Sequence, residues 1–450
     1  MDRRMQWQRL AALLVIAMLA AACGDDGADE GETGAPAETG ADSTDGTDVE
    51  EPSPAPADGT EAGGEPAGGG ADTDDELVLG YILPETGSLA YLGPPMVAAV
   101  SFAIDRINEA GGVLGLDVPP PVAGDEAEDA SIANQSADRL LAEGVDAIIG
   151  AAGSAMSLAI IDKVTGAGVV QCSGSNTAPT FTDYPDGGYY FRTAPTDALQ
   201  GPVLAETLIA DGAQSIVLMG RADDYGRGLV EVTGGALTEA GATVVEIIHD
   251  PAGQNFDAEV QQALDANADA VVVVAFEEGA QIIQGLIEGG LSADQLYGTD
   301  GVRSSELPAL VDPNNPNVLD GMKGTAPAPE LDEQFIADFT ETSGLTDTIF
   351  APQKYDCVNI VALAAEAAGS TAPDAIAAEI NGVTGGGTTC TSFAECRDLL
   401  AAGEDIDYDG ASGPLDFSDD GEPGVASYEV WAFEGGELNS LSTTESTLSG

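Results

Sequence analysis

One pattern constrains the fold of this chain more than any other: a short apolar run, a polar loop and a stretch with helical spacing follow one another repeatedly. In the first copy, residues 77–83 (LVLGYIL) form the apolar run, and residues 96–110 carry helical spacing that stops at Gly111 and Gly112. The later copies are residues 147–150 with 154–167, 216–219 with 228–240, and 270–275 with 280–289. This alternation predicts α/β lobes, each built on a doubly wound parallel sheet.

The composition of single elements supports buried sheets. Residues 270–275 (AVVVVA) are apolar at every position, as expected where helices cover both faces of a parallel sheet. The helix predicted over residues 256–266 places Phe256, Val260 and Leu264 four residues apart, which gives it one buried stripe.

The first residues have the features of an export signal. Three arginines precede residues 10–22, which are almost wholly apolar, and small residues lead into Cys23. This run of about 13 residues is shorter than the roughly 20 that a membrane span needs. Residues 19–23 (LAAAC) resemble a bacterial lipobox, with Ala20 where leucine is usual. We expect a removable signal peptide over residues 1–22 and lipid on Cys23; an ordinary signal cleaved nearby is the alternative.

The segment after Cys23 has a composition that cannot form a core. Residues 24–75 contain no aromatic residue, no Lys and no Arg, and consist mainly of Gly, Ala, Pro, Thr, Glu and Asp. Too little apolar surface is available there to offset the entropy lost on ordering. We therefore expect residues 23–75 to be a disordered acidic tether that joins the anchor to the folded part.

The charge of the folded part excludes one large class of partner. Beyond residue 75 the chain carries 60 Asp and Glu residues against 10 Lys and Arg residues. Nucleic-acid binding requires Lys and Arg to neutralise phosphates, so no nucleic-acid partner is expected. We interpret the acids as solvation of the surface.

Cysteine and histidine usage limits the chemistry further. Cys172, Cys357, Cys390 and Cys396 are an even set behind an export signal, which favours disulfides over metal ligation. Cys390 and Cys396 bracket a short loop and are predicted to pair, which leaves Cys172 and Cys357 either paired or as two buried thiols. The single histidine, His249, is expected at the surface at a strand end. It allows neither a His-based zinc site nor a Ser-His-Asp triad.

The motifs of the common enzyme classes are missing from the sequence. We find no G-x-G-x-x-G after a strand, no G-x-x-x-x-G-K-[ST] and no G-x-S-x-G. We expect no catalytic residue, no cofactor and no metal. Three predicted loops are instead rich in hydroxyl groups: residues 86–88, 153–154 and 173–177. Helix capping and anion binding both explain such loops and are compatible, because a cap also presents backbone N–H groups.

The order of several segments gives a more specific interpretation. These segments are residues 80–88 (GYILPETGS), 103–115 (AIDRINEAGGVLG), 191–202 (FRTAPTDALQGP), 224–229 (DYGRGL), 298–301 (GTDG) and 412–417 (SGPLDF). Together they resemble the branched-chain amino-acid-binding proteins of ABC importers, which have the type I periplasmic binding protein fold and the leucine-binding domain. The resemblance covers residues 76–436.

The resemblance implies two lobes joined by a three-segment hinge, with crossovers near Pro195, Pro327 and Tyr428. Lobe one would comprise residues 76–195 and 327–427, and lobe two residues 196–326 and 428–450. The ligand would lie between the lobes, which close on it. Cys172 and Cys357 would then both belong to lobe one, so a bond between them would leave the hinge free.

The same resemblance implies the ligand-binding residues. Ser154 and Thr177 match positions that hold a ligand carboxylate, and Ser175 matches a residue whose carbonyl accepts from the ammonium group. Lobe two would supply the aromatic walls and the acid that pairs with the ammonium group, namely Tyr225, Phe276 and Asp300. A zwitterion that leaves water needs such partners for both charges.

Two departures limit the ligand class. Leu92 stands where some members place an aromatic residue, and Asp300 is one methylene shorter than the Glu of the branched-chain binders. The implied function is capture of an amino acid, amide or similar small polar ligand outside the cytoplasm, by a monomer anchored to the membrane that serves an ABC permease. A sensor of the same fold that signals to a partner is the alternative; an enzyme would require turnover of a bound compound.

Overall fold

The computed structural model describes residues 76–328 and 333–447. The expected signal peptide, the lipid-bearing Cys23 and the tether lie outside these residues. Within these two ranges, no helix has both the length and the apolar composition needed to cross a membrane. The same residues contain no group of His, Cys, Asp or Glu side chains arranged to hold a metal ion.

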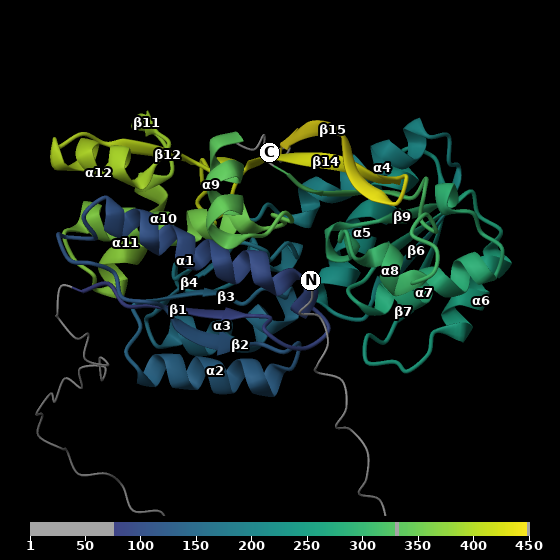
Figure 1. The fold of residues 1–450 in the computed structure, drawn as a ribbon, viewed down its shortest axis with the longest axis horizontal. Helices are drawn as coiled ribbons and strands as arrows, with labels where there is room; N and C mark the ends of the chain where they lie inside the picture. Colours follow the sequence, from purple (N-terminus) through teal and green to yellow (C-terminus); the bar gives the residue numbers. More distant parts are fainter. Residues whose placement is uncertain (1–75, 329–332, 448–450) are drawn as a thin grey trace, which may run out of the picture. The chain divides into compact units, whose positions relative to one another are not determined.

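The first sheet is fully parallel, with the strand order β2-β1-β3-β4-β5. Helices α2 and α3 cover one face, and α1, α10 and α11 cover the other (Figure 1). The elements are β1 (Leu79–Leu83), α1 (Gly93–Glu109), β2 (Val122–Asp125), α2 (Ala130–Ala142), β3 (Ala147–Gly150), α3 (Ser154–Gly166), β4 (Val170–Ser173), β5 (Tyr190–Arg192), α10 (Ala351–Ala368) and α11 (Pro373–Val383). This is one doubly wound lobe.

Helix α10 is the central helix of this lobe. Its residues are almost all buried from Ala351 to Ala365, as expected for a helix packed on every side. The helix starts at Ala351 with Pro352 in its first turn. Proline is accommodated there since the first-turn N–H groups have no helical partner. Cys357 consequently lies in the second turn, inside the core.

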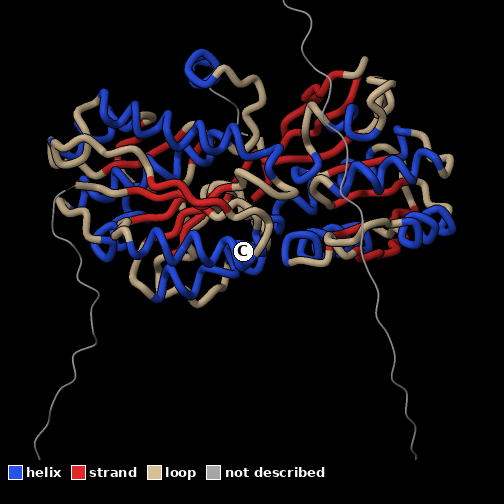
Figure 2. Tube along the Cα trace, turned by 60° about the horizontal axis from the view of Figure 1, so that its bottom comes forward, coloured by secondary structure: helices blue, strands red, loops and turns tan. Residues whose placement is uncertain are grey.

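The second sheet has seven strands in the order β15-β14-β10-β9-β8-β6-β7. Its parallel part is again covered by helices on both faces (Figure 2). The elements are α4 (Asp197–Ala210), β6 (Ser215–Arg221), α5 (Asp224–Glu239), β7 (Thr243–His249), α6 (Asp257–Ala266), β8 (Ala270–Val274), α7 (Glu278–Glu288), β9 (Leu296–Gly298), α8 (Leu307–Val311) and β10 (Lys323–Pro327). The predicted class of two doubly wound parallel-sheet lobes is confirmed.

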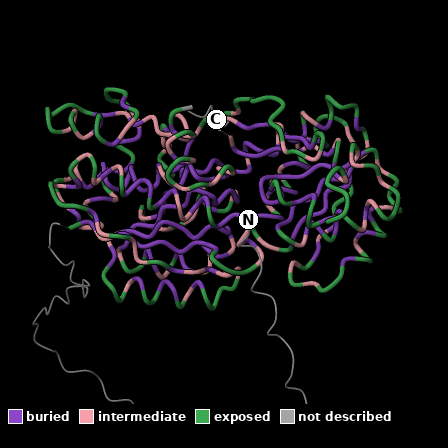
Figure 3. Tube along the Cα trace, in the orientation of Figure 1, coloured by how far each residue is buried: buried purple, intermediate pink, exposed green. Residues whose placement is uncertain are grey.

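Two strands extend the second sheet in a way that the repeated unit did not predict. β14 (Val425–Glu434) runs antiparallel to β10, and β15 (Glu437–Thr447) runs antiparallel to β14. β15 is exposed along most of its length, and its sequence accordingly has no apolar run of the kind that predicted the parallel strands. The core lies under the inner strands, which Figure 3 shows as buried while the outer helix faces are exposed.

The chain passes between the two sheets at three places: from β5 to α4, from β10 to α9 and α10, and from β13 to β14. The remaining elements are α9 (Glu333–Ser343), β11 (Thr388–Cys390), α12 (Phe393–Ala401), β12 (Ile406–Gly410) and β13 (Gly413–Pro414), with a three-stranded sheet of β11, β12 and β13. The exact lobe boundaries near Pro195, Pro327 and Tyr428 stay a prediction.

The structure contains the predicted bond between Cys390 and Cys396, and of the two alternatives for Cys172 and Cys357 it contains the disulfide. Cys390 and Cys396 pair across the start of α12 with Cα atoms 5.4 Å apart. Cys172 on β4 and Cys357 on α10 pair with Cα atoms 5.8 Å apart, within the range that a disulfide requires.

We expect the local bond to contribute modestly to stability. Replacing Cys390 and Cys396 together with Ala should lower the free energy of unfolding by about 2 kcal/mol, because the loop that the bond closes is short. Urea denaturation of the full chain measures this change. A loss as large as that from removing the other disulfide would contradict the loop-length argument.

Candidate functional site

The carboxyl ends of strands from both sheets meet around one small cavity, where open α/β sheets bind ligands. All seven residues that the sequence resemblance selected line it, together with six others. The lining residues are Leu89, Leu92, Met96, Ala152, Gly153, Ser154, Ser175, Thr177 and Phe350 from the first lobe, and Tyr225, Phe276, Asp300 and Gly301 from the second. Its volume is about 20 Å³, room for about one water. An amino acid therefore enters only if side chains or lobes move apart.

Hydroxyl groups and a helix N-terminus form the first lobe's side of the cavity. Ser154 is the first residue of α3, and the backbone N–H groups at such a position attract anions. Ser175 and Thr177 follow β4, and both are almost fully buried. The Ser175 hydroxyl donates to the Ala152 carbonyl at 3.1 Å, which ties the two loops together. This wall can accommodate a carboxylate.

Two buried ionisable residues, Glu126 and Lys354, lie behind this wall, and no sequence pattern indicated either of them. The Glu126 carboxyl accepts from the backbone N–H groups of Ala152 and Gly153 at 2.6 and 3.1 Å. Burial, followed by the nearby Glu128 charge, raises the Glu126 pKa to about 8. Burial lowers the pKa of Lys354 to about 7, and the Glu126 charge opposes this shift. Glu126 fixes the loop that leads to Ser154. Lys354 can carry a positive charge next to Glu126.

Asp300 provides the acid on the second lobe's side. It follows β9 and accepts hydrogen bonds from the Tyr225 hydroxyl at 2.9 Å and from the Gln200 amide at 3.0 Å. Tyr225 and Phe276 stack with ring centroids 5.4 Å apart and form the aromatic wall. The residue after Asp300 must be glycine, because a Cβ on Gly301 would lie only 2.6 Å from the Ala275 carbonyl oxygen. The wall combines apolar surface with one carboxylate.

A second acid lies close behind Asp300. Asp197 begins α4, is fully buried, and neither of its oxygens has a well-formed hydrogen bond among the described residues. Burial, followed by the Asp300 charge, raises its pKa well above the usual range, although Thr177 and Arg192 act in the opposite direction. Two buried carboxyls in this position cannot both be ionised at low cost. A bound cation would compensate one of them.

Two contacts join the lobes at the cavity rim. The Arg221 guanidinium of β6 donates to Glu128 of the first lobe at 2.7 Å, and the Tyr91 hydroxyl donates to the Gly301 carbonyl. Arg221 also lies 3.5 Å from the Phe276 ring centroid, on the aromatic wall. The sequence resemblance pointed to Leu92 at the aromatic position, but its neighbour Tyr91 is the aromatic residue that contacts the other lobe.

The expectation for His249 is wrong. His249 does end a strand, but it is fully buried rather than at the surface. Its ring packs edge-on against Phe256, and its Nε2 atom lies 3.4 Å from Glu278. The residue therefore supports the charged cluster around Arg221, which no sequence pattern indicated.

We expect ligand affinity to depend on pH through Asp300. Burial raises its pKa to about 6, against the lowering effect of the hydrogen bonds from Tyr225 and Gln200. An ammonium group requires the ionised carboxylate, so the dissociation constant of an amino acid should rise about tenfold between about pH 7 and pH 5. Calorimetric titration at several pH values measures it. An unchanged dissociation constant would contradict this assignment.

The fold and this site together define a protein with two α/β lobes and a small, partly polar cavity between the ends of their strands. The family model described as periplasmic binding protein matches residues 76–435. The chain belongs to this family.

Individual proteins show the same similarity. The chain is 23% identical to Leu/Ile/Val-binding protein homolog 3 of Brucella melitensis, over 81% of this chain and 94% of that protein. It is 26% identical to the chemotactic signal transduction system substrate-binding protein BasB of Halobacterium salinarum, over 77% and 84% of the two chains. The crystal structure of the Streptococcus pneumoniae branched-chain amino acid transporter substrate binding protein LivJ with isoleucine has a TM-score of 0.67 at 21% identity, covering 83% and 99%.

Proposed function

We propose that the chain captures an α-amino acid with an apolar side chain outside the cytoplasm and delivers it to an ABC importer. The observation that carries the proposal is the polarity of the cavity. Ser154 and Thr177 at one side can donate to a carboxylate, and Asp300 at the other side can accept from an ammonium group. The names of relatives such as the Brucella melitensis protein support an amino acid as the ligand.

The rest of the lining favours an apolar side chain on that amino acid. Met96, Phe276 and Phe350 line the cavity, and none of the lining residues that the structure describes is Lys, Arg or His. An apolar side chain gains free energy by leaving water for such surroundings, whereas a second ligand charge would have no partner there. The relatives are named as binding proteins, so we propose that the site binds its ligand and does not transform it.

A thermal-shift panel on the purified full chain tests the proposal. Leucine, isoleucine, valine and alanine are compared with glutamate, lysine, benzoate, acetamide and urea. Apolar amino acids should raise the melting temperature, because a ligand at about 100 times its dissociation constant adds about 2.7 kcal/mol of stability. Stabilisation by benzoate or amides alone would overturn the amino-acid assignment.

A sensor is the second candidate, because BasB is named as part of a chemotactic signal transduction system. The binding site would be the same, and the partner would differ. Deleting the gene of this chain in its native host separates the two functions. Loss of uptake of the bound amino acid supports the importer, whereas intact uptake with loss of a behavioural response in a mutant of this chain supports the sensor.

The proposed anchoring is tested separately. We propose that the protein is a monomeric lipoprotein with lipid on Cys23, and that residues 24–75 let the lobes reach a membrane partner. Cells fed a labelled fatty acid should incorporate the label into the wild-type chain but not into Cys23→Ser. Label in both proteins would contradict the assignment of Cys23.

A further inference from the structure

Arg221, the last residue of β6, makes a buried ion pair between the two lobes, although it does not line the amino-acid cavity. Its guanidinium donates to Glu128 of the first lobe at 2.7 Å, and the two side chains are only 2% and 10% exposed. Salt screens a pair at this depth much less than a pair at the surface. The pair can therefore stabilise one arrangement of the lobes, which exposed ion pairs do only weakly.

The acids around Arg221 differ in what they lose when the lobes separate. Asp223 and Glu278 belong to the same lobe as Arg221 and pair with it in every arrangement of the lobes. Glu128 belongs to the other lobe, and Arg221 is its one cationic partner within residues 76–328 and 333–447. Separation of the lobes therefore breaks the pair with Glu128 and leaves Arg221 neutralised by its own lobe.

The loop between β2 and α2 holds Glu128 in a conformation that costs free energy. Ala127 and Glu128 both have positive φ, 49° and 52°, which residues with a Cβ rarely adopt. The Ala127 N–H group donates to the Asp125 carboxylate at 3.0 Å, and a Cβ on Gly87 would lie 2.2 Å from the Ala127 carbonyl oxygen. Such backbone persists where its surroundings fix it, and it is concentrated at functional positions. The fold thus specifies the place of Glu128 opposite Arg221.

Each partner of the ion pair also packs against a wall of the amino-acid cavity. In the first lobe, Glu128 Oε1 lies so close to Gly153 that a Cβ on this glycine would be 2.6 Å from it. In the second lobe, the Arg221 guanidinium lies 3.5 Å from the Phe276 ring centroid. Gly153 and Phe276 both line the cavity. The pair therefore joins the two walls from outside the cavity.

A second contact joins the lobes at the same rim. The Tyr91 hydroxyl of the first lobe donates to the Gly301 carbonyl, directly after Asp300. Gly301 lines the cavity, whereas Tyr91 does not. This hydrogen bond holds the turn that carries Asp300 against the first lobe.

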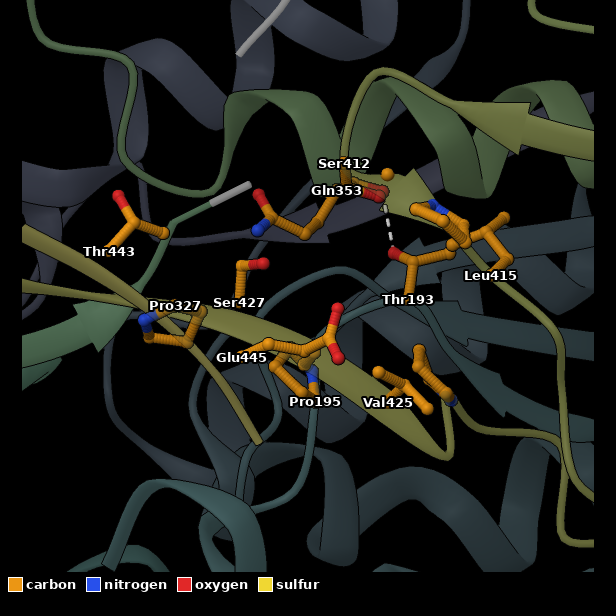
Figure 4. Close-up of a pocket in the computed structure, with 14 residues that line it drawn as sticks. Thr193, Pro195, Pro327, Gln353, Ser412, Leu415, Val425, Ser427, Thr443 and Glu445 are labelled. Carbon is orange, nitrogen blue, oxygen red and sulfur yellow. Dashed lines mark hydrogen bonds between the residues drawn. The ribbon is translucent and has the colours of Figure 1, made fainter. Parts of the chain in front are cut away.

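The crossovers between the lobes are not close-packed on one side. A cavity of about 600 Å³ lies there, and Pro195, Pro327 and Val425 contribute to its lining from the three crossovers (Figure 4). Empty space supplies no packing contacts. This part of the hinge therefore offers little resistance to rotation of the lobes, and contacts at the rim of the amino-acid cavity are needed to keep them closed.

We propose that Glu128 with Arg221, and Tyr91 with Gly301, form a latch that keeps the lobes closed over a bound amino acid. Glu128, Arg221 and Tyr91 are positioning residues, because they act on the ligand through the cavity walls. The latch rests on the proposed capture of an amino acid between the lobes. A ligand leaves only when the lobes separate, so the latch slows release and has little effect on entry.

Stopped-flow measurement of leucine association and dissociation with the full chain tests the latch. Glu128→Gln removes the charge and keeps the shape of the side chain, and it should release leucine at least about tenfold faster. Tyr91→Phe removes only the hydroxyl group, and release should be about threefold faster. The association rate constant of both variants should stay within about twofold of the wild-type value. Urea denaturation without ligand separates this effect from a purely structural role, which would lower stability and leave the release rate unchanged.

Asp223→Asn is the matched control, because it removes one charge from the same arginine within the second lobe. Asn can still accept from the Gly226 N–H group and cap α5, as Asp223 does. Its release rate should stay within about twofold of wild type. Equal acceleration in Asp223→Asn and Glu128→Gln would show that only the placement of Arg221 on Phe276 matters and would overturn the latch.

The two proposals fail in distinguishable ways. If the wild-type chain binds leucine but Glu128→Gln and Tyr91→Phe both release it at the wild-type rate, only the latch is wrong. If the wild-type chain binds no leucine, the proposed function is overturned, and the latch falls with it.

Discussion

Asp300→Ala is expected to weaken binding of leucine by at least about 2 kcal/mol, roughly thirtyfold, while binding of 4-methylpentanoate changes far less. 4-Methylpentanoate is leucine without the ammonium group, and this group is the one that would donate hydrogen bonds to the Asp300 carboxylate. Asp300 is only 4% exposed, so solvent can replace little of the lost interaction. Calorimetric titration of both compounds against the full chain measures the difference.

Two variants sharpen this experiment. Asp300→Asn keeps the shape of the side chain and removes its charge, so it should lose nearly as much affinity for leucine. Asp224→Asn removes one charge from the exposed start of α5 in the same lobe and should change nothing. Equal losses for leucine and 4-methylpentanoate in Asp300→Ala would disprove the pairing of Asp300 with the ammonium group.

The neighbouring Asp197 sets an upper limit on the effect. It is buried beside Asp300, and burial followed by the Asp300 charge raises its pKa, so ionisation of Asp300 favours the protonated form of Asp197. Once Asp300 is removed, the Asp197 pKa falls, and its carboxylate can partly compensate the ammonium charge. The double variant Asp300→Ala, Asp197→Asn should therefore bind leucine more weakly than Asp300→Ala alone.

Much of the fold and of the site's location followed from local patterns. β3 was predicted over residues 147–150, which are its observed bounds. β8 was predicted because its residues are apolar throughout, and in the structure they are buried on both faces of the sheet. Since parallel strands end at one edge of a sheet, the loops carrying Ser154 and Thr177 had to converge. The sequence resemblance then selected the individual residues within those loops.

The buried charges could not be predicted in the same way. Asp197 and Glu126 have no periodicity that distinguishes them from the many acids of the chain, most of which solvate the surface. Their burial depends on neighbours more than 20 residues away, as when Glu126 accepts from the Ala152 and Gly153 N–H groups. His249 was misplaced for the same reason, because its buried partners Phe256 and Glu278 become neighbours only in the folded lobe.

Removing the disulfide between Cys172 and Cys357 is expected to cause the largest loss of stability. The bond closes a sequence separation of 185 residues, which includes all the parallel strands of the second sheet. The chain-entropy model assigns such a loop about 5 kcal/mol of stabilisation. Replacing both residues with Ala should therefore lower the denaturant midpoint far more than removing the Cys390–Cys396 bond, which deletes the same number of sulfur atoms.

Ligand affinity should respond differently from stability in this variant. Both cysteines belong to elements of the first lobe, β4 and α10, so the bond does not cross the hinge. β4 leads directly to Ser175 and Thr177, but Ser175 is also held by its hydrogen bond to the Ala152 carbonyl. We therefore expect the folded variant to bind leucine within about threefold of the wild-type chain, which corresponds to about 0.7 kcal/mol of binding free energy.

Unchanged stability, measured by denaturation with and without reductant, would show that the bond constrains little of the unfolded chain. A large loss of affinity with stability retained would instead show that the bond holds the ligand loop in place.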